Sequence, residues 1–338
     1  MKPIGYVMSA INGKTEDRRA FTMLLSLYGA RLTDCDPELY FSDPQKYLQG
    51  QIAVFDAFTP DIIFSPFALA FETKRFGTTL IFPGKYPPNI KKPSSLSVSE
   101  IIKTFPASPS EDPAIKYMVS CVKLLKNHFG DDVPICSPIV SCTDLPAMVL
   151  GIEAWIDLLI SDPDTASAFL EFTTAHFKAY SDMLFEAGSS FLVVPSGFTN
   201  PQLMYPGLIE NVCLKALEES FSKLKGPAVL HHGGTRFDFL FEKPFSLPNM
   251  AGVLIDSKDS FSKARSSVPT GTLLIGNFQG PMLNARDPDF IINSIQKILE
   301  NRKDDPHFIF CTSGADVPWD TPYENLKIVS DFFTKAHR

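Results

Sequence analysis

The feature that most constrains the fold of this chain is an alternation of short apolar runs with longer segments of helical periodicity. Gly, Pro or Asp bounds the apolar runs, which is typical of strands buried on both faces of a parallel sheet. The predicted strands are Ile4–Met8, Asp61–Pro66, Pro134–Val140, Ser190–Val194, Ala228–His232, Gly252–Asp256, Thr272–Asn277 and His307–Cys311. The predicted helices are Tyr40–Phe58, Pro113–Phe129, Pro146–Ile160, Thr165–Ala187, Pro206–Leu224, Pro288–Glu300 and Pro322–Ala336.

Eight strands that alternate with helices predict an α/β fold, a (β/α)8 TIM barrel that spans residues 1–338 as a single domain. An open, doubly wound sheet is the alternative, but no GxGxxG motif follows any predicted strand. We also expect an N-terminal extension and a long insertion near residues 82–109. That stretch is rich in Pro, Ser and Lys, which indicates an exposed excursion that includes a hairpin.

The composition and net charge exclude several classes of protein and of binding partner. The formal net charge of −7 argues against nucleic acid or an anionic membrane surface as the main partner. No run approaches the roughly 18 apolar residues of a membrane span, and the N-terminus does not read as a secretory signal. The six cysteines form no CxxC pair, so we expect reduced thiols in a cytoplasmic protein.

Polar residues at the predicted strand ends are the candidate site, because active sites of such barrels form at the C-terminal ends of the strands. These residues lack the paired carboxylates of glycoside hydrolases, and the chain has no HExxH, P-loop or GxSxG motif. The candidates, together with Arg236 just beyond one strand, are Ser196, His231, His232, Asp256, Asn277, Gln279, Ser313 and Asp316.

The run Val229–Thr235 (VLHHGGT) is the richest local feature of the sequence. Two adjacent histidines on a strand point to opposite faces, so at most one would face the mouth of the barrel. A buried, hydrogen-bonded histidine is an equally good interpretation of either one. In the same way, Asp256 suits either a helix cap or a ligand contact, and Asn277 suits either a turn or a recognition amide.

Several segments resemble the uroporphyrinogen decarboxylase superfamily, which includes cobalamin-dependent methyltransferases that methylate coenzyme M. Gly276–Pro288 is similar to the family's GN…P…L…TPE segment. Ser313–Asn325 is similar to its glycine-rich turn and PxDTPxEN helix start. Glu186–Gly188 and Leu230–Gly234 also match. The resemblance covers most of the chain and implies a (β/α)8 barrel, in agreement with the strand count.

The sequence differs from the family pattern at positions that would bind the substrate or a zinc ion. The arginine-rich motif that holds the porphyrinogen carboxylates has no counterpart in Met8–Thr15, which disfavours decarboxylation. The thiol methyltransferases bind zinc through an H-x-C motif and a later cysteine. Here the histidine corresponds to His231, while Gly233 and Ala315 stand at the cysteine positions, so we expect no metal site of that kind.

A thiol acceptor needs zinc to become a thiolate at neutral pH, whereas an amine with a free lone pair does not. The resemblance therefore implies a zinc-independent methyltransferase that moves a methyl group from methylcobalamin, carried on a partner corrinoid protein, to tetrahydrofolate. Asp256 and Asn277 would recognise the pterin, with support from Gln279 and His231. The assigned site comprises catalytic candidates Asn277, His231 and Asp256, and substrate-binding candidates Gln279, His232, Ser196, Ser313, Asp316 and Arg236.

A cation at Arg236, Lys258 or Arg286 would pair with the glutamate tail of the folate. Three alternatives remain open at this stage. One is a thiol methyltransferase with a rearranged metal site that uses His231, His232 and Asp316. The others are a decarboxylase of this family, or a pterin- or corrinoid-binding module without catalysis.

Overall fold

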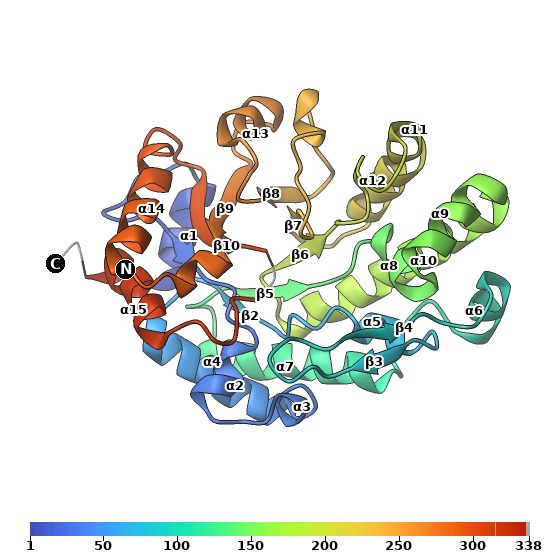
Figure 1. The fold of residues 1–338 in the computed structure, drawn as a ribbon, viewed down its shortest axis with the longest axis horizontal. Helices are drawn as coiled ribbons and strands as arrows, with labels where there is room; N and C mark the ends of the chain where they lie inside the picture. The colour runs from blue at the N-terminus through green and yellow to red at the C-terminus, as the bar shows by residue number, and fades with distance from the viewer. Residues whose placement is uncertain (315, 336–338) are drawn as a thin grey trace.

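The core of the computed structural model, which describes residues 1–314 and 316–335, is an eight-stranded, all-parallel sheet that curves into a barrel (Figure 1). Its order is β1-β10-β9-β8-β7-β6-β5-β2. The strands of this sheet are β1 (Phe21–Thr22), β2 (Ile63–Phe64), β5 (Ile135–Pro138), β6 (Phe191–Pro195), β7 (Ala228–His231), β8 (Met250–Leu254), β9 (Leu273–Gln279) and β10 (Phe308–Ser313).

Contacts between β1 and the two residues that precede β2 bring together the two edges of the sheet. The backbone N–H of Asp61 donates to the carbonyl of Phe21 at 2.9 Å, and the Thr22 hydroxyl donates to the carbonyl of Ile62 at 2.9 Å. The Asp61 carboxylate also accepts both guanidinium nitrogens of Arg18, at 2.6 and 2.7 Å. This buried, bidentate ion pair holds the seam, and the predicted (β/α)8 barrel is confirmed.

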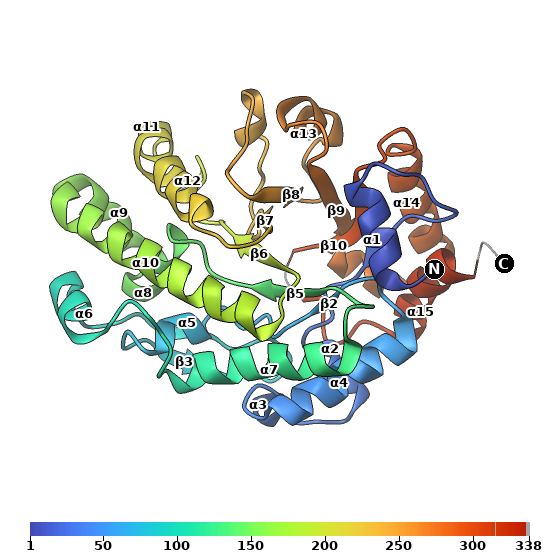
Figure 2. The ribbon, with the colours of Figure 1, turned by 180° about the vertical axis from the view of Figure 1, so that it is seen from behind.

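Helices surround the barrel on the outside (Figures 1 and 2). Several begin with an Asp-Pro pair. Asp112, for example, accepts the N–H groups of Ala114 and Ile115 while Pro113 occupies the first turn. The helices are α1 (Pro3–Ile11), α2 (Tyr28–Leu32), α3 (Pro37–Tyr40), α4 (Pro44–Phe58), α5 (Phe71–Lys74), α6 (Val98–Thr104), α7 (Pro113–Phe129), α8 (Asp144–Leu150), α9 (Ile152–Ser161), α10 (Pro163–Ala187), α11 (Pro206–Leu208), the π-helical turn η1 (Ile209–Cys213), α12 (Leu214–Ser222), the 3-10 turns η2 (Leu240–Glu242) and η3 (Gly280–Asn284), α13 (Phe261–Ser267), α14 (Pro288–Glu300) and α15 (Tyr323–Thr334).

The first predicted strand is wrong, because Ile4–Met8 lies inside helix α1. Pro3 occupies the first turn of that helix, and the buried residues Tyr6, Val7 and Ala10 recur at helical spacing. These three side chains belong to the same buried cluster as barrel residues such as Val229 and Ile309. Helix α1 therefore packs on the barrel as the expected N-terminal extension, and the first strand is β1.

The expected insertion contains a hairpin and a helix. Strands β3 (Thr79–Ile81) and β4 (Asn89–Lys92) pair antiparallel outside the barrel, and α6 follows them. The backbone N–H of Ser94, just after β4, donates to the carbonyl of Val149 at 2.8 Å. This bond joins the hairpin segment to helix α8, near the mouth of the barrel.

All six cysteines are free thiols, as the sequence predicts, and five of them are buried. Among the described residues, no helix has the length and apolar character needed to cross a membrane.

Candidate functional site

A cavity of about 540 Å³ opens at the C-terminal ends of the central strands, between the β3–β4 hairpin and the loops that follow β6 and β7. Its volume suits a ligand of ordinary cofactor size, and its walls are mostly apolar, with a few polar groups. The lining residues are Phe67, Leu69, Asn89, Ile90, Lys91, Pro93, Asp144, Ala147, Met148, Gly151, Ile152, Pro195, Gly197, Phe198, Leu203, His231, Gly233, Gly234 and Thr235.

The two histidines lie side by side, because His232 follows the end of β7 and is outside the strand's alternation. Their rings stack with centroids 4.5 Å apart and an interplanar angle of 13°. The N–H of Gly233 donates to His231 Nδ1 at 2.8 Å, so the ring proton sits on Nε2, which donates to the carbonyl of Gly314 at 3.0 Å. His231 therefore has both ring nitrogens bonded to backbone. It lines the cavity as a neutral group.

Burial of the histidines determines their charge. Desolvation, followed by the neighbouring ring of His232, lowers the pKa of His231 to about 3. Desolvation also lowers the pKa of His232 to about 4. At neutral pH neither ring carries a charge, so His231 presents a polar but uncharged face to a ligand.

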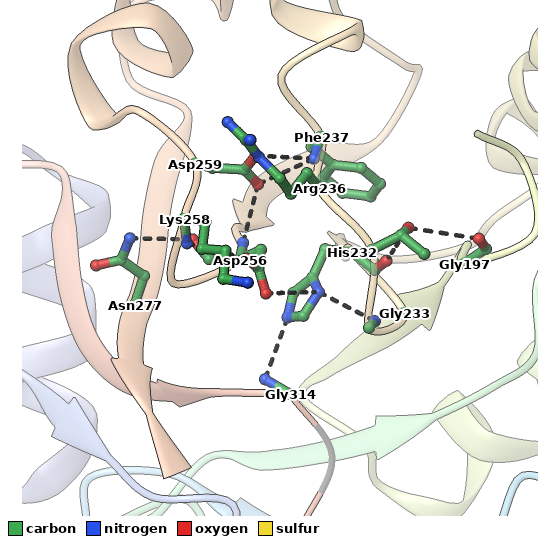
Figure 3. A network of polar contacts seen from close by, with 12 residues as sticks. Gly197, His232, Gly233, Arg236, Phe237, Asp256, Lys258, Asp259, Asn277 and Gly314 are labelled. Atoms are coloured by element: carbon green, nitrogen blue, oxygen red, sulfur yellow. Dashed lines mark hydrogen bonds and ion pairs between the residues drawn. The ribbon is translucent and has the colours of Figure 1, made fainter. Parts of the chain in front are cut away.

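A polar network connects His232 to the ends of β8 and β9 (Figure 3). Asp256 Oδ2 lies 3.8 Å from His232 Nδ1, and Asp256 Oδ1 accepts the N–H of Lys258 at 2.9 Å. The Asn277 amide donates to the carbonyl of Asp256 at 3.0 Å. Asp259 accepts the N–H groups of Asp256 and Phe237, and burial raises the pKa of Asp259 to about 6. The network brings together the predicted residues His232, Asp256 and Asn277.

The other predicted residues are more dispersed. Ser196 and Ser313 are buried at the ends of β6 and β10, while Gln279 is exposed at the end of β9. Arg236 pairs with Asp238, and its Nε lies 3.9 Å from Asp259 Oδ1, beside the polar network (Figure 3). Asp316 Oδ1 accepts the N–H of Leu27 at 3.0 Å, and burial raises the pKa of Asp316 to about 7.

Asp144 is a cavity residue that the sequence analysis did not identify. It stands at the start of α8 and is only 5% exposed. Its carboxylate accepts the N–H of Gly197 at 2.6 Å and of Phe198 at 3.2 Å, which fixes the loop after β6. Burial raises the pKa of Asp144 to about 7, against the lowering effect of these hydrogen bonds. In the sequence, an aspartate before a helical run reads simply as a helix start.

Gly233, which stands at the first expected cysteine position, does not fit a zinc ligand. Gly233 has a φ of +61°, and a Cβ atom on it would meet the backbone nitrogen of Gly197 and lie 2.6 Å from the Gly197 Cα. His231 already uses both ring nitrogens. Within the part of the chain that the structure describes, no group of three His, Cys, Asp or Glu side chains is arranged to hold a metal. Ala315, the second expected cysteine position, lies outside the described residues.

The family model "Uroporphyrinogen decarboxylase (URO-D)" matches residues 3–336, nearly the whole chain. The chain belongs to the uroporphyrinogen decarboxylase family. The resemblance noted in the GN…P and DTPYEN segments is thereby confirmed, and the barrel is the fold of this family.

Within the family, the chain is similar to a methylcobamide:CoM methyltransferase, MtaA, from Methanosarcina barkeri. The two are 21% identical over 224 residues, which make up 66% of this chain and 64% of the relative.

Solved structures show the same fold at low identity. A methyltransferase from Methanosarcina mazei superposes with a TM-score of 0.80 at 16% identity, covering 98% of this chain and 99% of that one. A B12-independent methionine synthase from a Shewanella species gives a TM-score of 0.54 at 11% identity, with 87% and 86% coverage.

Proposed function

We propose that this protein is a zinc-independent methyltransferase, acting in the cytoplasm, that moves a methyl group from a methyl-corrinoid on a partner corrinoid protein to tetrahydrofolate. The observation that carries the proposal is the backbone contact of Gly233 with Gly197 beside the cavity. It leaves no room for a zinc-binding side chain at that position. The similarity to a methylcobamide methyltransferase supports the class of donor.

The nature of the acceptor follows from acid–base chemistry. A thiol has a pKa of about 8.5 and attacks only as the thiolate, so without a metal it reacts slowly at neutral pH. At the inner wall of the cavity His231 is neutral and Asp144 is partly protonated, and neither supplies the positive charge that would favour a thiolate. The Lys91 ammonium also lines the cavity, but it lies on the exposed hairpin strand. A nitrogen nucleophile such as N5 of tetrahydrofolate has a free lone pair at that pH and needs no such help.

The reaction would be an in-line displacement. The lone pair of the acceptor nitrogen forms the new N–CH3 bond as the Co–C bond of the donor substrate breaks, and the Co–C electron pair stays with the departing corrinoid. The methylated nitrogen then loses its proton to water. The protein's contribution is to hold the two reactants in line and to exclude water.

The residues of the polar network are proposed as positioning groups. Asp256 Oδ2 lies 3.8 Å from Nδ1 of His232, whose ring stacks on His231 at the cavity wall. Asn277 fixes the backbone of Asp256. Through these contacts, the pair selected from the sequence would set the orientation of the acceptor from one side of the mouth.

The test is methyl transfer from free methylcobalamin, followed by its visible spectrum, with tetrahydrofolate and separately with 2-mercaptoethanesulfonate as acceptor. We expect demethylation with tetrahydrofolate and negligible turnover with the thiol. Turnover with the thiol alone, together with about one zinc per chain by elemental analysis, would instead assign a thiol methyltransferase with a rearranged metal site.

A further inference from the structure

The cavity has two charged groups at different depths. Asp144, buried at 5% exposure, forms part of its inner wall, whereas Lys91 on strand β4 is exposed at its rim. The two residues come from segments that are far apart in the sequence. The bond from Ser94 N–H to Val149 O holds the end of the hairpin segment against α8, the helix that begins at Asp144.

The hydrogen bonds on the Asp144 carboxyl group fall unequally on its two oxygens. Oδ2 accepts the N–H groups of Gly197 at 2.6 Å and Phe198 at 3.2 Å, whereas Oδ1 has only a longer contact of 3.3 Å with the Phe198 N–H, so Oδ1 keeps more acceptor capacity for a ligand. The bonds from these two N–H groups fix the orientation of the carboxyl group before any ligand enters. A pre-oriented, buried acceptor of this kind favours a ligand edge that carries N–H donors, because an edge of acceptors would be repelled and left without partners.

The rim of the cavity, in contrast, favours an anionic group of the ligand. Among the described residues, the Lys91 ammonium has no hydrogen bond or ion pair, and it adds positive charge to the hairpin side of the cavity. Most of the other lining side chains are apolar, and they include the aromatic rings of Phe67 and Phe198. The cavity therefore combines a buried carboxyl group, apolar walls and an exposed cation.

We propose that Asp144 and Lys91 set the orientation of the acceptor: an N–H-bearing heterocycle binds inward against Asp144, and an anionic tail lies outward at Lys91. This inference rests on the proposed function, and for tetrahydrofolate it places the pterin inside and the glutamate at the rim. Neither residue follows from the strand-end rule, since Asp144 begins a helix and Lys91 belongs to the hairpin.

The experiment measures equilibrium binding of two probes, tetrahydrofolate and the tail-less 6-methyltetrahydropterin, to the wild-type chain and to variants. Asp144→Asn keeps the volume of the side chain but replaces one acceptor oxygen with a donor. We expect it to weaken both probes by about 10- to 100-fold, as for loss of hydrogen bonds to a charged group. Lys91→Gln should weaken tetrahydrofolate by about three-fold, the size of an exposed ion pair, and leave the pterin unchanged.

Lys92→Gln is the matched control, because Lys92 is the same residue type, is exposed on the same strand and does not line the cavity. It should leave both affinities unchanged. If Asp144→Asn does not fold, the wild-type chain still provides a test. The wild-type chain should bind tetrahydrofolate more tightly than the pterin by about three-fold, the same factor that Lys91→Gln is expected to remove.

The outcomes separate the two proposals. Wild-type binding of tetrahydrofolate with no effect of either Asp144→Asn or Lys91→Gln would overturn the orientation and leave the acceptor assignment standing. An equal loss of both probes in Lys91→Gln would overturn the outward placement of the tail. If the wild-type chain binds neither probe, the proposed function is overturned, and the orientation with it.

Discussion

Replacement of Gly233 by alanine should destabilise the protein far more than the same change at its neighbour. The backbone of Gly233 has a φ of +61°, and a Cβ atom there would lie 2.6 Å from the Cα and closer still to the nitrogen of Gly197. Both contacts are with backbone, so no side-chain rotation relieves them. A left-handed conformation costs an alanine about 1–2 kcal/mol, and overpacking of this kind adds about 1–3 kcal/mol.

Gly234→Ala provides the matched control. Gly234 has a φ of +93°, and a Cβ atom there would meet nothing within 4 Å. It therefore incurs the conformational cost, about 1–2 kcal/mol, without the overpacking. The difference between the two variants, about 1–3 kcal/mol, isolates the contact of Gly233 with Gly197.

Urea unfolding at fixed pH measures this difference from the shift in midpoint at constant slope. For the same reason we expect Gly233→Cys, which places a cysteine where the family resemblance implies a zinc ligand, to be destabilised and to bind no zinc. Equal midpoints for Gly233→Ala and Gly234→Ala would show that the loop yields easily. Stoichiometric zinc in Gly233→Cys would refute the argument that the backbone excludes a metal ligand.

Three further predictions concern titration and binding. Burial raises the pKa of Asp144 from 3.8 to about 7, so the folded chain holds that proton more tightly than the unfolded chain. Wild-type stability should therefore fall relative to Asp144→Asn as pH rises from 4 to 7, by up to roughly 4 kcal/mol, and a difference independent of pH would contradict this. Asp256→Ala should weaken tetrahydrofolate binding more than it lowers the melting temperature. An unchanged Kd with a lowered Tm would assign Asp256 to the turn with Lys258. The rate of methyl transfer to tetrahydrofolate should not climb between about pH 7 and 9, whereas a climb through that range would indicate attack by a thiolate.

Many helices and strands of the barrel can be predicted from the sequence, because the residues that begin and end them act locally. The helices Pro113–Phe129 and Pro288–Glu300 have the predicted bounds, since an aspartate cap and a proline mark each start. The prediction of a strand at Ile4–Met8 is wrong, because a short apolar run is compatible with either a strand or a helix. The packing of this segment against the barrel, which the sequence alone does not show, favours the helix.

The site was less predictable than the fold. The strand-end rule predicts His231, which lines the cavity. It also predicts His232, Asp256 and Asn277, which form a network beside the cavity. It does not predict the walls that come from the hairpin and from α8. Asp144 reads locally as a helix start, and only tertiary packing places it beside Gly197. The stacking of His231 on His232 depends on where β7 ends, and that boundary is the least certain part of a sequence-based interpretation.

Zinc-independent methyl transfer to tetrahydrofolate can be measured in a single assay. Protein of measured zinc content is mixed with methylcobalamin and tetrahydrofolate, with and without a strong chelator, and 5-methyltetrahydrofolate is quantified against the loss of methylcobalamin. We expect equal amounts of product and consumed donor, at a rate that the chelator leaves unchanged. Product formation that is abolished by the chelator and restored by zinc, or transfer to a thiol and not to tetrahydrofolate, would contradict this expectation.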